Sequence, residues 1–284
     1  MAELTLQSLL EAGAHFGHQT SRWNPQMRRY ILTAKNGIHL INLEETLTCV
    51  QAAAQKLAQV QENGRSILFV GTKNQAKDAV REAAEKCKQC YVNVRWLGGL
   101  LTNYSTIKKS LKKVDDIDRM EQDGTFKLLP KKEVNRLRKK RERILNFLAG
   151  VKEMKGLPGA VVIVDILKEH ISLLEARRLK IPVIGILDTN ADPTKVEFPI
   201  PANDDSLKTV QLILDSLADV IAATPIKVVQ RDNKDDEGDG RRRIVKRKII
   251  KTIVRKKRLK GSGEAAEETS VSDAAASSES VSHE

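Results

Sequence analysis

SILFVGT, residues Ser66 to Thr72, is a short continuous apolar run that ends in a polar turn, and a helical pattern from about Gln75 to Lys88 follows it. Such a run is typical of a strand buried on both faces, and the helix after it is typical of a crossover to a parallel neighbour. Further helical patterns lie at 169–179 and 205–223. Four more runs have the same character: YVNVRW (91–96), AVVIVDI (160–166), PVIGILDT (182–189) and EFPIPAND (197–204). Five strands alternating with helices predict a three-layer α/β domain with a mostly parallel, five-stranded sheet.

Two patterns precede the first strand. Apolar residues recur at three- and four-residue steps from Leu43 to Val60, and Asn63-Gly64 stops them, which predicts an amphipathic helix. Before it, YILTAKNGIHLI has apolar residues on both sides of Asn36-Gly37 and predicts a β-hairpin over 30–42 beside the sheet.

The alternation of strands and helices is interrupted between Tyr104 and Met154. Apolar residues there follow heptad spacing on two arms around a turn that contains Gly124 and Pro130. This pattern predicts an antiparallel coiled-coil hairpin inserted at 104–155. Its longer arm, Lys131 to Lys155, would reach roughly 37 Å at about 1.5 Å per residue. The α/β domain then comprises residues 1–103 and 156–228, and a tail comprises 229–284.

The charge of the chain is concentrated in two segments. The net charge is +12, and residues 105–155, with 16 basic and 8 acidic residues, carry +8 of it. Residues 231–284 carry +3, and their composition changes from acidic to basic and then to Ser, Ala and Glu, which predicts a disordered extension. The rest of the chain is nearly neutral. Such clustering indicates a phosphate-backbone partner.

The three cysteines favour a reducing compartment. Cys49, Cys87 and Cys90 cannot form an even disulfide set, and the CxxC of the last two ends a helical pattern where a thioredoxin-like motif would begin one. They are interpreted as packing or surface thiols. No apolar run is long enough for a membrane helix and no signal peptide is recognisable, so we expect a cytoplasmic protein without a membrane partner.

The sequence offers little for catalysis or for a cofactor. FVGTKNQAK matches neither GxxxxGK[ST] nor GxGxxG, so the backbone amides of a known phosphate loop are not provided, although the same turn could hold an RNA phosphate. His15 and His18 supply two metal ligands where zinc needs three or four. We therefore expect no cofactor, no metal and no catalytic residue. We expect the two histidines to pack a tight turn or to contact RNA.

Two acid-free stretches mix cations with aromatic side chains, as RNA-binding surfaces do. The first, Ala12 to Leu43, has arginines for bidentate phosphate contacts, and the second runs from Lys86 to Val114. The predicted RNA-binding residues are Arg22, Trp23, Asn24, Arg28, Arg29, Tyr30, Lys35, Asn36, Lys73, Asn74, Arg95, Trp96, Thr102, Asn103, Lys108, Lys109, Lys112, Lys139 and Lys140.

Several motifs resemble those of a known family. LLEAGAHFGHQTSRWNPQMRRYI, NGIHLINLEETL, FVGTKNQA, RWLGGLLTNYSTI, LPGAVVIVD and IPVIGILDTNADP are similar to the bacterial-type members of the second universal small-subunit ribosomal protein family, collinearly from Leu4 to about Pro225. The resemblance implies a flavodoxin-like domain with a protruding coiled coil and no catalysis. It also implies a place on the solvent side of the small subunit where head meets body.

The partners implied by the resemblance are small-subunit ribosomal RNA and neighbouring ribosomal proteins, including the large messenger-binding protein built from OB-folds. The tail after Arg231 is longer and more basic than the family pattern. A different class of function also stays open at this point: a nucleotide-dependent α/β enzyme that acts on RNA.

Overall fold

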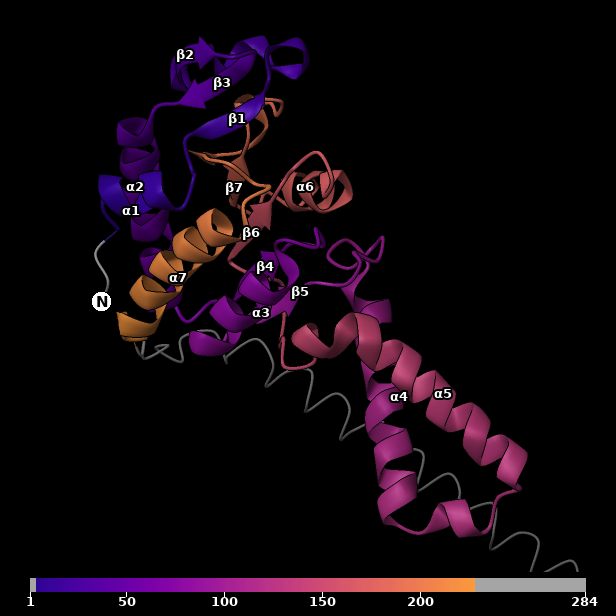
Figure 1. Cartoon of the computed structure of the whole chain (residues 1–284). Coiled ribbons are helices and arrows are strands. Elements are labelled where there is room, and N and C mark those ends of the chain that lie inside the picture. The colour runs from indigo at the N-terminus through magenta and orange to yellow at the C-terminus, as the bar shows by residue number, and fades with distance from the viewer. Residues whose placement is uncertain (1–3, 228–284) are drawn as a thin grey trace, which may run out of the picture. The chain divides into compact units, whose positions relative to one another are not determined.

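The computed structural model describes residues 4–227, and its centre is a five-stranded parallel sheet (Figure 1). The strand order is β5-β4-β6-β7-β8. The second strand of this sheet along the chain, β5, pairs with one edge of β4, and the next three strands are added in order from its other edge. The strands are β4 (Ile67–Val70), β5 (Cys90–Val92), β6 (Ala160–Val164), β7 (Val183–Leu187) and β8 (Phe198–Pro201). All five lie within the runs that the sequence predicts as strands, except that β5 starts one residue earlier.

Both faces of the sheet are covered. Ile67 and Phe69 pack into one core cluster with α2 (Leu43–Glu62), α3 (Lys77–Lys86) and α7 (Leu207–Ala223). Their neighbours on the same strand, Leu68 and Val70, pack into a second cluster on the opposite face, because successive side chains of a strand alternate. That second face is covered by α6 (His170–Arg178), by the loop before α4 and by the base of the helical hairpin. The predicted three-layer α/β fold is confirmed.

The inserted segment forms two helices that run side by side, α4 (Tyr104–Gln122) and α5 (Lys131–Leu148) (Figure 1). The second arm is shorter than predicted: α5 stops at Leu148, which makes it about 27 Å long at 1.5 Å per residue. A 3₁₀ turn, Ala149–Val151, follows, and a side chain at Gly150 would collide with the carbonyl group of Tyr91. The chain therefore leaves the helix where it must pack closely against β5.

An antiparallel sheet of three strands precedes α2, after the short helix α1 (Leu6–Glu11). The predicted hairpin is present as β2 (Ile31–Lys35) and β3 (Ile38–Ile41), and Asn36 and Gly37 at its turn both have positive φ angles, 52° and 76°. The third strand, β1 (Phe16–Gln19), pairs with β3 and was not predicted. Its sequence, FGHQ, has little strand preference, and the pairing is irregular.

The predicted disordered tail, 229–284, lies outside the described residues. Within residues 4–227 no helix combines the length and the apolar character that crossing a membrane requires.

Candidate nucleic-acid interface

The first set of predicted contacts lies on two short turns between β1 and β2. Arg22 ends the turn Thr20–Arg22, and Arg28 and Arg29 lie in the last turn of Pro25–Tyr30; all three are exposed. Asn24 fixes the second turn, since its side chain accepts a hydrogen bond from the Gln26 amide at 3.0 Å. The three guanidinium groups are thus presented to solvent by a backbone that is itself held in place.

The aromatic residues near these arginines are less accessible than the sequence suggests. Tyr30 is 1% exposed, and the guanidinium of Arg29 lies over its ring at 4.3 Å from the ring centre. Trp23 is half-buried and packs against His39, with 5.1 Å between ring centres. Tyr30 therefore anchors the turn and has no face left for a base. Trp23 keeps a part of its surface open.

The N-terminal sheet is attached to the carboxyl-terminal edge of the parallel sheet through His18. Its amide donates to the Thr189 hydroxyl at 2.9 Å, and its Nδ1 lies 2.8 Å from Asp188 Oδ2. The hydrogen bond to Asp188 raises the pKa of His18, although partial burial opposes it. His15 packs against Phe16, and burial lowers its pKa. No group of three or more His, Cys, Asp or Glu among the described residues is arranged to hold a metal ion.

Lys73, predicted to hold an RNA phosphate, contacts carboxylates of its own chain. Its Nζ lies 2.7 Å from Asp204, 2.5 Å from Asp205 and 3.5 Å from Asp165, at the ends of β4, β6 and β8. Burial alone would lower the pKa of Lys73, but the hydrogen bonds to Asp204 and Asp205 outweigh it and raise that pKa. Doubly wound sheets bind their ligands at the carboxyl-terminal ends of their strands. In this protein the ammonium group of Lys73 occupies that position and is bound by three carboxylates. Its neighbour Asn74 is exposed.

Asp204 makes this cluster sensitive to pH. The residue is 2% exposed, and burial, together with the nearby charge of Asp165, raises its pKa to about 7 in spite of Lys73. The unfolded chain has an ordinary aspartate pKa of about 3.9, so the folded state binds the proton more tightly. The stability that this proton provides is present below about pH 4 and is lost as the pH rises through about 7.

We therefore expect the Asp204 contribution to the free energy of unfolding to fall between about pH 4 and pH 7, by at most about 1.4 kcal/mol per pH unit. The raised pKa of His18 acts in the same direction as the pH rises through its own titration. Asp204→Asn removes the carboxyl whose pKa is raised to about 7, so the unfolding free energy of this variant should change less with pH. Urea unfolding of both proteins at pH 5, 6, 7 and 8 measures this, and identical pH slopes would contradict it.

The second set of predicted contacts begins in the loop 95–103, which a single carboxylate holds in place. Glu175 of α6 accepts hydrogen bonds from the Trp96 indole at 3.1 Å and from the amides of Gly99, Leu101 and Thr102 at 2.7, 3.0 and 3.0 Å. Burial would raise the pKa of Glu175, but these hydrogen bonds lower it overall. Trp96 is only 7% exposed and belongs to the core. Arg95, Thr102 and Asn103 remain exposed.

The sequence did not single out Glu175. It lies in an ordinary helical pattern, 73 or more residues from the loop that it binds. Nothing local in ISLLEARR distinguishes it from a surface glutamate.

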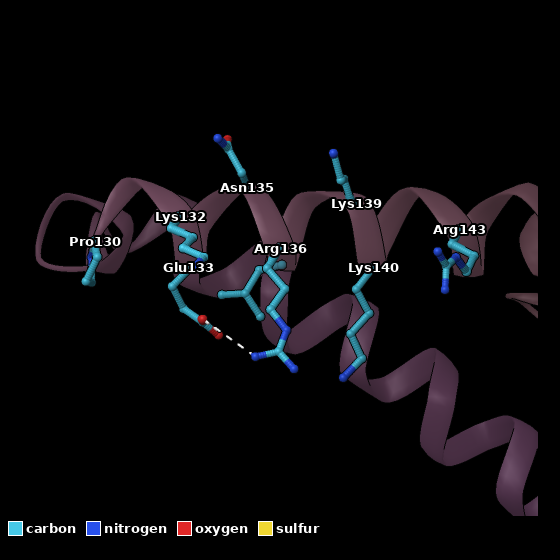
Figure 2. Close-up of a pocket in the computed structure, with 9 residues that line it drawn as sticks. Pro130, Lys132, Glu133, Asn135, Arg136, Lys139, Lys140 and Arg143 are labelled. Carbon is cyan, nitrogen blue, oxygen red and sulfur yellow. Dashed lines mark ion pairs between the residues drawn. The ribbon is translucent and has the colours of Figure 1, made fainter.

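The helical hairpin carries the remaining cations. Lys108, Lys109 and Lys112 are exposed on α4, and Lys139 and Lys140 are exposed on α5. Figure 2 shows the side chains of α5 that line an open hollow along the helix, including Lys132, Arg136 and Arg143, which were not among the predicted residues. Because they recur at three- and four-residue steps, they extend the surface that Lys139 and Lys140 begin.

Ion pairs separate the cations of α5 into two groups. Arg138 lies 2.8 Å from Glu121, and Arg141 also pairs with Asp118, so both connect α5 to α4. Arg136 faces only Glu133 at 3.9 Å (Figure 2). Within residues 4–227, Lys132, Lys139, Lys140 and Arg143 form no ion pair shorter than 4.0 Å. Their charge is available to a partner.

Lys35 and Asn36 lie at the tip of the β2–β3 hairpin and are both exposed. Most of the predicted residues fall into two sets. We call the first the N-terminal surface (Arg22, Trp23, Arg28, Arg29, Lys35, Asn36), in which all but the half-buried Trp23 are exposed. The second, the hairpin surface, is exposed and combines predicted residues with the two cations Lys132 and Arg143 that the structure adds (Arg95, Asn103, Lys108, Lys109, Lys112, Lys132, Lys139, Lys140, Arg143). Tyr30, Lys73 and Trp96 contact the protein itself.

One comparison with known proteins bears on these surfaces. The family model described as ribosomal protein S2 matches residues 9–224. The matched range begins in α1, includes both sheets and the α4–α5 hairpin, and ends one residue after α7.

Proposed function

Because the chain belongs to the ribosomal protein S2 family, we propose that it binds small-subunit ribosomal RNA through the N-terminal surface and the hairpin surface. The family makes it a structural, non-catalytic constituent of the small ribosomal subunit that serves translation within a ribonucleoprotein. The observation that carries the proposal is the uncompensated charge of α5. Five cations there, Lys131, Lys132, Lys139, Lys140 and Arg143, form no ion pair among the described residues, and a surface used only for solubility needs no such excess.

The two surfaces differ in the chemistry they offer to RNA. The N-terminal surface combines guanidinium groups with the half-buried ring of Trp23, which suits phosphates beside an unstacked base. The hairpin surface consists mainly of lysines along two helices, which suits the backbone of a helical RNA segment. Asn24 and Thr102 supply hydrogen-bonding groups beside the cations of the two surfaces. Asn74 is exposed next to Lys73.

The proposed location is the solvent side of the small subunit, where head meets body, on cytoplasmic ribosomes. There the protein would also help dock the large messenger-binding protein built from OB-folds. The outer side of α6 supports a protein contact, because Ile171 and Leu174 on that helix are 44% and 61% exposed at a three-residue spacing, and Leu167 in the turn before it is 47% exposed. Lys168 and Arg178 flank these apolar side chains and are exposed.

Sedimentation tests the proposal as a whole. The tagged full chain is expected to sediment with small subunits in a one-to-one ratio and to remain bound after a high-salt wash. Loss of the chain at moderate salt, or a ratio far below one, would contradict a structural role.

A more specific prediction concerns Arg22, Arg28 and Arg29. Their joint replacement by alanine should weaken binding to deproteinised small-subunit RNA and reduce the salt slope by roughly 0.7 to 0.9 for each phosphate that is no longer neutralised. The melting temperature should change little, since all three side chains are exposed. Replacing Arg65, Arg81 and Lys208, exposed cations outside both surfaces, makes a control of equal charge change. An unaltered slope, or a large fall in melting temperature, would assign the three arginines to the fold.

A further inference from the structure

The Glu175 carboxylate accepts five hydrogen bonds from a single loop, residues 96–102. Its Oε1 accepts from the Trp96 indole and the Gly99 amide, and its Oε2 accepts from the amides of Leu101 and Thr102 and from the Thr102 hydroxyl at 3.1 Å. The residue is 8% exposed. Five donors within seven residues therefore converge on one buried anion.

The chemistry of this arrangement requires a carboxylate. An ionised carboxylate accepts hydrogen bonds at both oxygens and donates none, so it matches five converging donors. Gly99 has a φ of +84°, a left-handed conformation that lets its amide turn toward Glu175 without strain. Without the carboxylate, three backbone amides and an indole N–H would lose their partner, and each of these groups that stays buried would destabilise the present loop conformation.

The loop in turn sets the start of the hairpin surface. Leu100 and Leu101 are buried in the core, while Asn103, directly after Thr102, accepts hydrogen bonds at its carbonyl from the Thr106 amide at 3.0 Å and from the Ile107 amide. These bonds form the first turn of α4. The exposed cations Lys108 and Lys109 follow within two turns.

We propose that Glu175 is a positioning residue for RNA binding: its carboxylate holds the 96–102 loop so that Arg95, Asn103 and the first turns of α4 form a preordered part of the hairpin surface. This inference rests on the proposed RNA-binding function. Glu175 does not touch the RNA, because a buried anion surrounded by its own donors offers nothing to a phosphate. Its effect is to remove the entropy cost of ordering the loop at the moment of binding.

The decisive variant is Glu175→Gln, which keeps the size of the side chain. A glutamine has one acceptor oxygen, and its NH₂ group would face at least two of the present donors. We expect amide hydrogen exchange at Gly99, Leu101 and Thr102 to accelerate in the free full-length protein. If the variant holds the binding-competent loop conformation in roughly a tenth of its molecules, its affinity for deproteinised small-subunit RNA should fall about tenfold, because the apparent affinity is reduced by that fraction.

The salt dependence of binding separates positioning from direct contact. A residue that binds phosphate changes the salt slope when it is removed, whereas Glu175→Gln should leave the slope as it is, because the bound state keeps the same phosphate contacts. A residue that only stabilises the fold would lower the melting temperature without changing the affinity measured well below it. Lys108→Ala with Lys109→Ala is the matched phosphate-binding variant, in which the slope should fall.

A milder variant keeps the inference testable where Glu175→Gln does not fold. Trp96→Phe removes one of the five donors and retains a buried ring, so RNA affinity should fall two- to threefold with the same slope. The inference is overturned by a folded Glu175→Gln protein that binds RNA as the unaltered chain does, or by Trp96→Phe with unchanged affinity. An unaltered chain that shows no salt-dependent RNA binding would overturn the proposed function itself, and this inference with it.

Discussion

Reversing the charge of Lys132, Lys139, Lys140 and Arg143 to glutamate is expected to lower affinity for small-subunit RNA about a thousandfold at about 0.1 M salt. These cations lie along α5 without an acidic partner among the described residues (Figure 2). If each of the four cations neutralises one phosphate, each contributes roughly 0.7 to 0.9 to the slope of log K against log salt concentration. Their reversal then reduces that slope by about 3. At about 0.1 M salt this lowers the binding constant by about three powers of ten.

The hairpin itself should stay folded in this variant. The apolar seam is untouched, since Leu137, Ile144 and Leu148 keep their places and all four replaced side chains are exposed. Circular dichroism and the melting temperature check this directly. Each new glutamate adds only a few tenths of a kcal/mol of repulsion with neighbours on the same helix.

A matched control uses the other cations of the same helix. Arg138→Gln with Arg141→Gln removes side chains that already pair with Glu121 and Asp118 on α4. Stability should fall by up to about 1 kcal/mol for each pair, and RNA affinity should change little. A loss of binding free energy in both variants in proportion to the charge that each removes would mean that total charge matters and that the exposed row on α5 does not. A charge-reversed protein that binds RNA normally would make the hairpin a packing device.

The parallel sheet could be predicted because burial on both faces leaves a continuous apolar run, which SILFVGT and AVVIVDI display. The β2–β3 turn could be predicted because Asn36-Gly37 supplies the two positive φ angles that a tight hairpin needs. By contrast, β1 depends on its pairing with β3 and on contacts of Gly17 and His18 with Thr189, across 171 residues. Nothing in FGHQ itself encodes those partners.

The candidate site was predicted by residue type and in part by position. Exposed arginines and lysines were found because clustered charge is visible in a sequence. The direction in which a side chain points is not visible there: the rings of Tyr30 and Trp96 predict stacking on bases, but both side chains lie in the core. Lys73 is predicted to bind RNA because it is a cation directly after a strand, but the three aspartates that contact it come from loops 92 to 132 residues away. Only the fold brings those loops to one edge.

Replacement of Lys73 by methionine is expected to lower the free energy of unfolding by about 3 kcal/mol at pH 7.5. Removing one partner of a buried ion pair leaves an uncompensated charge, which costs about 3–5 kcal/mol, and the lower value applies because the Lys73 side chain is 15% exposed. Asp204, at 2% exposure, would then have no cation beside it, and Asp165 would remain as a repelling neighbour.

The effect of this replacement should depend on pH in a defined direction. Because the pKa of Asp204 is raised to about 7, its carboxyl is mostly neutral at pH 5, where the loss of Lys73 should cost less than at pH 7.5. Loss of Lys73 also removes what lowers the pKa of Asp204, so the buried carboxyl must take up a proton or stay charged without its cation. Adding Asp204→Asn to Lys73→Met removes this ionisable carboxyl, so the double variant should be more stable at pH 7.5 than Lys73→Met. Urea unfolding of the four proteins at both pH values completes the cycle.

The same variants decide between the two roles open to Lys73. If its ammonium group holds an RNA phosphate, Lys73→Met will weaken RNA binding and reduce the salt slope while the unfolding free energy stays constant. If it serves the carboxylates at the sheet edge, stability will fall and the salt slope of the folded variant will not change. The distances of 2.5 and 2.7 Å to Asp205 and Asp204 favour the second result, because a phosphate would have to displace two carboxylates already bound to the ammonium group.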